Sequence, residues 1–405
     1  MVRCQLYPLP LTPLKLGHNA NMTPRIAIIG AGPGGLSLAC ILRRNSIIPS
    51  IFERDSSADY RPQGGTLDLD VDSGQQALHD AGLWDQFLKY ARYDAQIMKF
   101  LTKSGDVVRQ VEPDTDKDTR PEIDRVALRN ILIDSFGNDR IHWGYELISV
   151  EPTQRGLYDL HFKNGKLEAG FDLVVGADGA HSRVRPRITS IESFYSGVSI
   201  IEVDISSPRG SRYDAVNELV GNGSAFAFGD QKSIQAQRLG DGTLRIYVCF
   251  AMEEVDPNWL KNKFDASDPA ATKSNAAPYF KDWKPAIQDC LLLADEDRVE
   301  FRPLYMHPVD ETWDFFPGLT LIGDAAHLMT PYAGEGVNIA MRDSLELAKK
   351  IIEGTKLGDL NQAIREYEID MFKRGSESKG RTNKNKKWFF AKEFPNSAER
   401  TEAEL

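Results

Sequence analysis

A run of glycines near the N-terminus has the spacing that lets a chain cradle a phosphate. Residues 30–35 read Gly-Ala-Gly-Pro-Gly-Gly, so glycine occupies the first, third and sixth positions. Gly30 permits a tight turn, Gly32 lets the backbone approach a pyrophosphate, and Gly35 lets a following helix pack closely on a strand. A tight turn in an unrelated α/β fold is the alternative interpretation of these residues.

The segments on both sides of this turn predict a strand–helix–strand unit. Residues 25–30 are short, continuous and apolar, as in a buried parallel strand, and an amphipathic helix then extends to about residue 44. A second strand over residues 50–53 ends at Glu53, whose carboxylate can accept hydrogen bonds from a ribose. The helix N-terminus presents free N–H groups to an anion. Together these features predict a dinucleotide-binding unit.

A second strand end carries polar residues. The predicted strand 172–175 leads into Asp178 and Gly179, with basic residues behind them at 183 and 185. An ordinary turn is the alternative interpretation, because Asp-Gly is a common turn pair.

A third strand end is followed by a glycine-rich helix start. The strand 319–323 leads into Asp324 and His327, and Gly336 and Val337 then open a helix. A strand-end aspartate can hold a ribityl hydroxyl. The positive end of the helix dipole can face the pyrimidine edge of a flavin ring and stabilise negative charge there.

The order of the segments predicts an α/β fold built on a Rossmann-like nucleotide-binding domain. From about residue 191 the sequence pattern changes to extended segments separated by glycines, which is typical of an antiparallel sheet. We therefore expect four parts: a disordered leader, a discontinuous nucleotide-binding domain, a substrate-binding sheet domain and a C-terminal helical segment. Their expected ranges are 1–24, 25–190 with 312–354, 191–311 and 355–405. The final helix should cover residues 360–374, and the Lys-rich stretch after it reads as a solvated helix end with an aromatic foot.

Composition narrows the possible partners. The formal charge is −10, which argues against a nucleic-acid partner because phosphate binding needs a concentrated basic surface. The four cysteines have no metal-ligand spacing, so we expect no metal site, and Cys40 reads as a buried, inert thiol. No run of about 18 apolar residues occurs, so we expect no membrane span and a cytoplasmic enzyme, either a monomer or a weak homodimer.

The three strand-end motifs, in this order and spacing, resemble group A flavoprotein monooxygenases of the para-hydroxybenzoate hydroxylase type over roughly residues 25–375. The stretches 61–69, 121–129 and 323–329 also look like those of the tetracycline-inactivating monooxygenases and related secondary-metabolite hydroxylases. The resemblance implies that the nucleotide-binding domain binds FAD. It also implies a role for each matching residue: Glu53 and Arg54 at the adenosine half of FAD, Asp68 on the flavin side, Arg125 and Arg129 at phosphates or ribityl, Asp324 at the ribityl chain, and Arg61 at the nicotinamide cofactor.

The resemblance implies an FAD-dependent monooxygenase that uses NADPH or NADH and dioxygen to hydroxylate a small cyclic substrate. A phenolic, enolic or polyketide-like compound from secondary metabolism fits this chemistry. His327 could relay a proton, and a structural histidine is the alternative interpretation. Tetracycline inactivation is an alternative, although the resemblance implies a glutamine and an arginine as substrate contacts, and near those places this chain has Glu202 and the small residues Gly223 and Ser224. A non-hydroxylating flavin module, a halogenase and an NAD(P)-dependent dehydrogenase are further alternatives.

Overall fold

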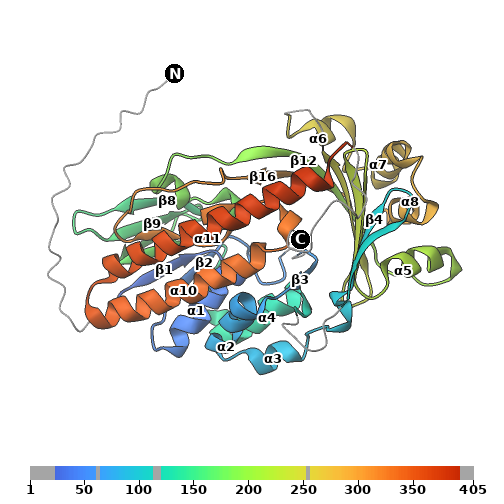
Figure 1. Cartoon of the computed structure of the whole chain (residues 1–405). Coiled ribbons are helices and arrows are strands. Elements are labelled where there is room, and N and C mark those ends of the chain that lie inside the picture. Colours follow the sequence, from blue (N-terminus) through green and yellow to red (C-terminus); the bar gives the residue numbers. More distant parts are fainter. Residues whose placement is uncertain (1–22, 61–63, 113–119, 252–255, 393–405) are drawn as a thin grey trace, which may run out of the picture.

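The structure is a computed structural model that describes residues 23–60, 64–112, 120–251 and 256–392. Two regions lie side by side in it (Figure 1). One contains a parallel sheet covered by helices, and the other contains a large sheet backed by α5 (Asp214–Val220), α6 (Trp259–Lys263), α7 (Pro269–Ala276) and α8 (Pro285–Leu292). The expected leader lies outside the described residues, apart from its last two positions.

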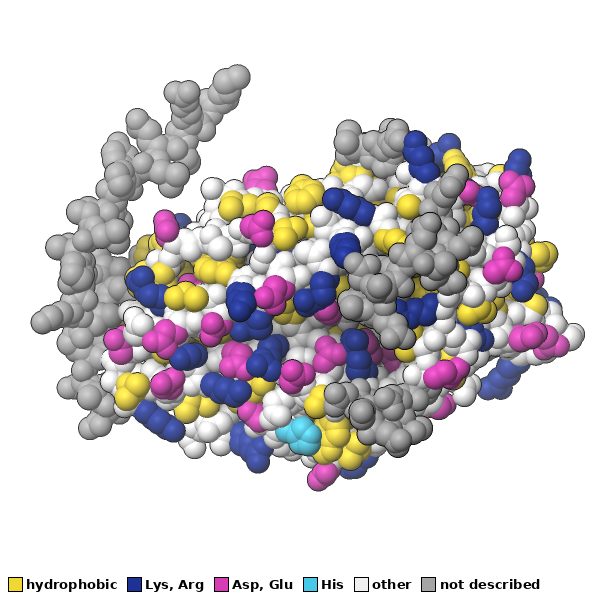
Figure 2. Space-filling model, viewed as in Figure 1, with side chains coloured by type: hydrophobic (Ala, Val, Ile, Leu, Met, Phe, Trp, Pro, Cys, Tyr) yellow, Lys and Arg dark blue, Asp and Glu magenta, His cyan; other side chains and the backbone are white. Residues whose placement is uncertain are grey.

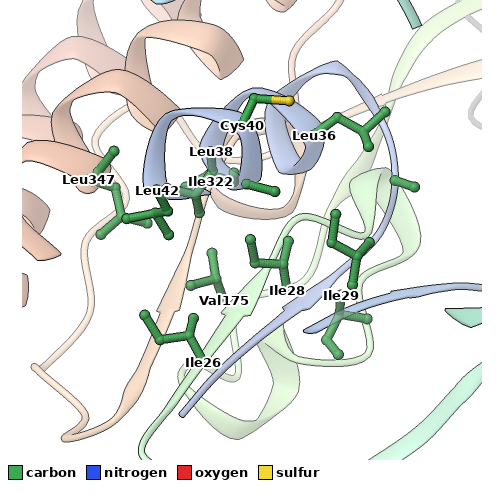
Figure 3. Close-up of a cluster of buried hydrophobic side chains, with 14 of the residues drawn as sticks. Ile26, Ile28, Ile29, Leu36, Leu38, Cys40, Leu42, Val175, Ile322 and Leu347 are labelled. Atoms are coloured by element: carbon green, nitrogen blue, oxygen red, sulfur yellow. The ribbon is translucent and has the colours of Figure 1, made fainter. Parts of the chain in front are cut away.

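The parallel sheet has five strands in the order β17-β11-β1-β2-β7. Their bounds are Ile26–Ile29 for β1, Ser50–Glu53 for β2, Ile141–Trp143 for β7, Leu173–Gly176 for β11 and Leu319–Leu321 for β17. All the pairings are parallel. The helix α1 (Pro33–Arg44) packs its leucines onto β1 and β11, and Figure 3 shows Leu38 and Leu42 above Ile26, Ile28 and Val175. Apolar strands buried on both faces need this cover.

The second sheet has seven strands in the order β16-β12-β15-β14-β13-β4-β5. Their bounds are Met98–Thr102 for β4, Val107–Val111 for β5, Phe194–Ile205 for β12, Ser224–Gly229 for β13, Lys232–Arg238 for β14, Leu244–Ala251 for β15 and Glu300–Met306 for β16. The expected sheet after residue 191 is present. However, β4 and β5 come from the range 25–190, so the strand pairing crosses a boundary at residue 190, and the domain limits remain a proposal.

Two smaller β structures complete the fold. A ribbon pairs β3 (Thr66–Asp68) with β6 (Glu122–Asp124), and a three-stranded sheet contains β8 (Leu147–Pro152), β9 (Tyr158–Phe162) and β10 (Leu167–Phe171). The remaining helices of the first region are α2 (Gln76–Ala81), α3 (Trp84–Leu88), α4 (Arg125–Phe136) and α9 (Asp324–His327). A π-helical turn, Val71–Gln75, precedes α2.

Two long helices, α10 (Gly336–Leu357) and α11 (Leu360–Phe389), cross the first region, and α11 reaches the large sheet (Figure 1). The expectation that the last helix ends at residue 374 is wrong, because α11 continues for four more turns. The aromatic foot is confirmed: Phe389 is buried and stacks on Phe228 with 4.5 Å between ring centroids. The stretch is not wholly solvated, since Lys379 is 2% exposed and its Nζ donates to the Pro308 carbonyl at 2.6 Å.

The charges on the surface and the burial of Cys40 are those expected from the composition. Basic and acidic side chains alternate on the face over α10 and α11 without a continuous basic patch there (Figure 2). None of the described helices is long and apolar enough to cross a membrane. Cys40 is a buried free thiol, and burial raises its pKa to about 11, which confirms the expectation of an inert thiol. Among the described residues no group of histidine, cysteine and acidic side chains could hold a metal ion.

Candidate functional site

The glycine turn between β1 and α1 faces open space at Gly32. Gly30 has φ +109°, and a Cβ there would lie 2.4 Å from the carbonyl oxygen of Ala177. A Cβ at Gly35 would lie 2.2 Å from the oxygen of Gly30, so both positions require glycine. A Cβ at Gly32 would meet no atom within 4 Å. The turn therefore keeps an open space at the middle glycine, where a phosphate group fits beside the N-terminus of α1.

Glu53 and Arg129 brace this turn from behind. The Glu53 carboxylate is buried and accepts hydrogen bonds from the backbone N–H of Ala31, at 2.7 Å, and of Asp55, at 3.0 Å. Arg129 is also buried, and it donates to the carbonyls of Ala31, at 3.0 Å, and Ala58, at 2.7 Å. In this structure both side chains orient the backbone of the turn, and their expected contacts with ribose and phosphate remain proposals. Arg54 is exposed, one residue beyond Glu53.

The second motif lies against the first. Asp178 follows β11, and its Cα would lie 3.1 Å from a Cβ at Gly30. One carboxylate oxygen, Oδ2, accepts from the backbone N–H of Arg183 at 2.6 Å. The other, Oδ1, is buried and has no hydrogen-bond partner among the described residues. Burial raises the pKa of Asp178. An unsatisfied buried oxygen beside the glycine turn fits a hydroxyl-bearing ligand.

The third motif completes the same edge of the sheet. Because β1, β11 and β17 are parallel neighbours, the residues that follow their carboxyl ends must meet. Asp324 begins α9 directly after Gly323, which has φ +59°. The Asp324 side chain is exposed, yet desolvation raises its pKa against the charges of His327 and Arg125. A carboxylate that is reachable by solvent but surrounded by protein lies within a recess, as a ligand contact requires.

The glycine-rich start of α10 opens beside this recess. Gly334 has φ +67°, and a Cβ at Gly336 would meet no atom within 4 Å. Asn338 then ties the helix to β3: its Nδ2 donates to the Asp68 carbonyl at 2.9 Å, and its Oδ1 accepts from Asp70 N at 2.8 Å. The sequence interpretation gave Asn338 no role. A polar residue in the first turn of α10, on the buried face of an amphipathic helix, was the available signal. Val337 occupies the first turn, as expected.

A charged cluster surrounds Asp68. Arg120 bridges Asp68, at 2.7 Å, and Asp70, at 2.6 Å, and Glu122 stands opposite Asp68 on β6. Burial, and then the charge of Asp68, raises the pKa of Glu122 to about 7. Arg125 starts α4, and its backbone N–H donates to the Gly65 carbonyl at 3.1 Å. The structure thus brings Asp68 and Arg125 to one side of the recess. Arg61, the expected nicotinamide contact, lies outside the described residues.

His327 faces away from the recess into a buried network. Its Nε2 lies 2.5 Å from Asp343 Oδ2, and that oxygen also accepts from the Gly323 N–H at 3.0 Å. Asp343 Oδ1 lies 3.2 Å from Arg374 of α11. Burial alone would raise the pKa of Asp343, but His327 and Arg374 outweigh it and lower the pKa. The histidine therefore holds the β17 turn against α10 and α11, which favours the structural interpretation over a proton relay.

The large sheet presents one face to the recess. In β15, Leu244, Ile246 and Val248 point into a core that packs on α5–α8, whereas Tyr247 and Cys249 point the other way. A Cβ at Gly65 would lie 2.9 Å from the Tyr247 hydroxyl and 3.0 Å from Gln237 Oε1. The two sides of the site therefore meet at Gly65.

The sequence indicates extended segments at residues 198–205, 224–228 and 244–250, and these lie on this wall in β12, β13 and β15. The strand β14 was missed, although its sequence alternates strictly between polar residues (Ser233, Gln235, Gln237) and apolar residues (Ile234, Ala236).

Comparisons with known proteins agree with this geometry. The family described as FAD binding domain matches residues 23–370. The monooxygenase asqM of Emericella nidulans is 32% identical over 374 residues, which cover 81% of this chain and 83% of that protein. Two solved structures have the same fold. HpxO of Klebsiella pneumoniae with FAD and uric acid has a TM-score of 0.75 at 21% identity, covering 93% of this chain and 91% of that chain. The tetracycline destructase Tet(55) has a TM-score of 0.71 at 21% identity, covering 93% and 92%.

Proposed function

Since this chain belongs to the family of FAD-dependent monooxygenases, we propose that it hydroxylates a small cyclic substrate of secondary metabolism, with NADPH or NADH as reductant. The relative asqM is named a monooxygenase, and the chain matches most of its length. The observation that carries the proposal is the meeting of three strand-end motifs around one recess, with open space at Gly32 and Gly336 and a reachable carboxylate at Asp324.

The residues present fit FAD. The open side of Gly32 admits the pyrophosphate to the N-terminus of α1, and Asp324 and Asp178 offer carboxylate oxygens to ribityl hydroxyls. When bound, FAD accepts a hydride from the nicotinamide and activates dioxygen.

The N-terminus of α10 supplies a positive field. Its first backbone N–H groups follow Gly334 and Gly336, and they stabilise negative charge on a ring placed beside them. The wall formed by the large sheet excludes water from the reacting centre. We assign positioning of the glycine turn to Glu53 and Arg129, because both already hold its backbone through buried hydrogen bonds.

The reductant contact is proposed at Arg61, as the family resemblance implies. The variant Arg61→Ala should slow flavin reduction by NADPH or NADH more than it weakens FAD retention. Stopped-flow reduction at several nucleotide concentrations, compared with the FAD content of the same preparation, measures both effects. The reverse ranking would remove Arg61 from the nucleotide site.

The activity itself is tested with purified FAD-loaded protein and a panel of phenolic and polyketide-like compounds. We expect one or more of them to stimulate NADPH or NADH consumption and to gain one labelled oxygen from heavy dioxygen. Consumption without any labelled product across the panel would favour the non-hydroxylating flavin module.

A cytoplasmic monomer or weak homodimer is proposed as the working form. The composition is ordinary for a globular protein, and the described cysteines Cys40, Cys249 and Cys290 are free, buried thiols, as in a reducing compartment. Light scattering over a concentration series measures the mass. A stable tetramer would contradict the proposal.

A further inference from the structure

One row of side chains crosses five strands of the large sheet on the face toward the recess. Strand pairing places Phe100 of β4 opposite Phe226 of β13, and Phe226 opposite Gln235 of β14. It continues from Gln235 to Tyr247 of β15 and from Tyr247 to Glu202 of β12. Directly paired residues point to the same face of a sheet. The row therefore changes from aromatic to hydrogen-bonding to charged along its length.

The aromatic end of this row is a rigid surface. Phe100 and Phe226 stack with 5.4 Å between ring centroids, and Phe100 lies parallel to Phe389 of α11 at 5.9 Å. Phe228 and Phe389 are buried beside them on the same face of the sheet, whereas Phe100 and Phe226 are only half-buried. Rings held in place by buried rings offer a rigid face on which another aromatic ring can stack.

The middle of the row offers hydrogen bonds close to the flavin side. The Tyr247 hydroxyl lies close to Gly65, where an added Cβ would stand 2.9 Å from it, and Gln235 is paired with Tyr247. Burial and the charge of Glu202 raise the pKa of Tyr247 to about 12, so its hydroxyl stays protonated and can donate. Strands lie about 4.8 Å apart, so Phe226 stands about 10 Å from Tyr247 along the row. This distance is longer than a single six-membered ring, so one such ring cannot contact both residues.

The charges at the flavin end of this face balance, because three arginines pair with the carboxylates of Glu202, Asp204 and Glu300. Arg245 pairs with Asp204 at 2.8 Å, and Arg302 pairs with Glu202 at 2.9 Å. Arg298 also contacts Glu202, at 3.5 Å; Arg245 is buried, Arg298 is half-buried and Arg302 is exposed. A carboxylate on the reacting ring would find these guanidinium groups already engaged, and its desolvation would stay uncompensated.

One further arginine stands at the opposite end of the face. Arg109 of the edge strand β5 lies opposite Phe100. Three strand spacings separate it from Gln235, which is about 14 Å. It is therefore too far away to hold a carboxylate on a ring beside Tyr247.

We propose that the substrate is an elongated molecule with two ring systems: an uncharged, hydrogen-bonding ring beside Tyr247 and Gln235, and an aryl ring stacked on Phe226 and Phe100. This inference rests on the proposed function and gives it a substrate class. The aryl ring anchors the molecule at the outer end of the row, and the hydrogen-bonding ring then lies at the flavin end.

The test uses three probes that differ by one feature at a time: 4-hydroxybenzoate, 4-hydroxybenzamide and 4-hydroxybenzanilide. Each is titrated into the FAD-loaded protein, and the change in flavin absorbance gives its Kd. We expect the amide to bind more tightly than the carboxylate. The anilide, with its second ring, should bind about ten- to one-hundred-fold more tightly than the amide.

Variants locate the second ring. Phe226→Leu should reduce the advantage of the anilide over the amide to less than about threefold, with FAD content unchanged. Phe100→Leu provides a second variant at the same place. Phe301→Leu is the matched control, because Phe301 packs on the opposite face of the sheet and should leave the advantage intact.

Three results would overturn the inference: tighter binding of the carboxylate than of the amide, an anilide advantage that persists in both Phe226→Leu and Phe100→Leu, or no binding of the anilide at about 1 mM. In each case FAD binding and labelled product from another compound would leave the proposed function standing. Failure of the function would show as an absence of labelled product from every compound.

Discussion

Replacing Gly32 by alanine separates cofactor binding from folding at the glycine turn. The backbone at Gly32 has φ −82° and ψ 176°, which alanine adopts without strain, and the added Cβ meets no protein atom within 4 Å. The variant should therefore fold. Its free energy of unfolding in the FAD-free form should equal that of the parent protein, or exceed it by about 0.5 kcal/mol because the unfolded chain loses freedom.

The same methyl group occupies the space in which the pyrophosphate approaches the backbone. Displacement of the phosphate breaks one or two charge-assisted hydrogen bonds, each contributing about 1.5–3 kcal/mol. We expect FAD affinity to fall about one-hundred- to one-thousand-fold, which corresponds to roughly 3–4 kcal/mol. The matched control is Gly35→Ala, where the Cβ would lie 2.2 Å from the oxygen of Gly30. That variant should lose stability even without FAD.

The assay is a pair of measurements on each variant: denaturant unfolding of the FAD-free protein, and fluorescence titration with FAD. The reasoning is refuted if Gly32→Ala binds FAD as tightly as the parent protein. It is equally refuted if the FAD-free Gly32→Ala protein is less stable than the FAD-free parent by more than about 1 kcal/mol.

Three further outcomes are expected. Asp324→Ala should lose bound flavin while circular dichroism shows a folded protein, and full flavin retention would show that the ribityl contact is misplaced. Burial raises the pKa of Glu368 from 4.5 to about 7, so the folded protein binds this proton more tightly than the unfolded chain and stability falls as the pH rises between these values. Glu368→Gln keeps an acceptor for Thr320 and should remove up to about 3 kcal/mol of that fall, and an unchanged pH profile of unfolding would contradict this. Phe389→Ala should cost about 3–5 kcal/mol in unfolding experiments, and a loss below about 1 kcal/mol would show that the foot of α11 does not hold the two regions together.

The parts of the fold with strong local signals could be predicted from the sequence. The strands at residues 26–29 and 50–53 are continuous apolar runs beside a glycine turn, and α1 and α10 begin at glycine-rich turns. The convergence of Asp178 and Asp324 followed from the rule that parallel strands place their carboxyl ends at one edge. The α/β class is confirmed, and the second sheet is antiparallel as expected except where β13 pairs in parallel with β4.

Other parts depend on contacts between distant residues. Nothing local in residues 98–111 shows that β4 pairs with β13, which is more than 100 residues away. The helix α11 contains Gly375, a poor helix former, because a Cβ there would lie 3.2 Å from His327 Cβ. The buried Lys379 Nζ donates a hydrogen bond to the Pro308 carbonyl, a partner that sequence patterning cannot reveal.

The helices α5–α8 were not predicted from the sequence, for a different reason. They lie between sheet strands in the sequence, and the segmented texture there indicated only extended structure. In the site, Glu53 and Arg129 lie at the glycine turn, and in the structure they support it through hydrogen bonds to the backbone. The types of the site residues and their positions at the turn could be predicted from the sequence. The direction of each side chain could not, because it depends on contacts with residues that are distant in the sequence.

Titration of the FAD-free protein with FAD tests the central claim most directly. If the segments after β1, β11 and β17 form one flavin site, the protein binds a single FAD per chain, and substitutions at Gly32 and Asp324 each weaken that same binding event. A preparation that stays colourless in excess FAD, or flavin binding unaffected by both substitutions, would contradict the account.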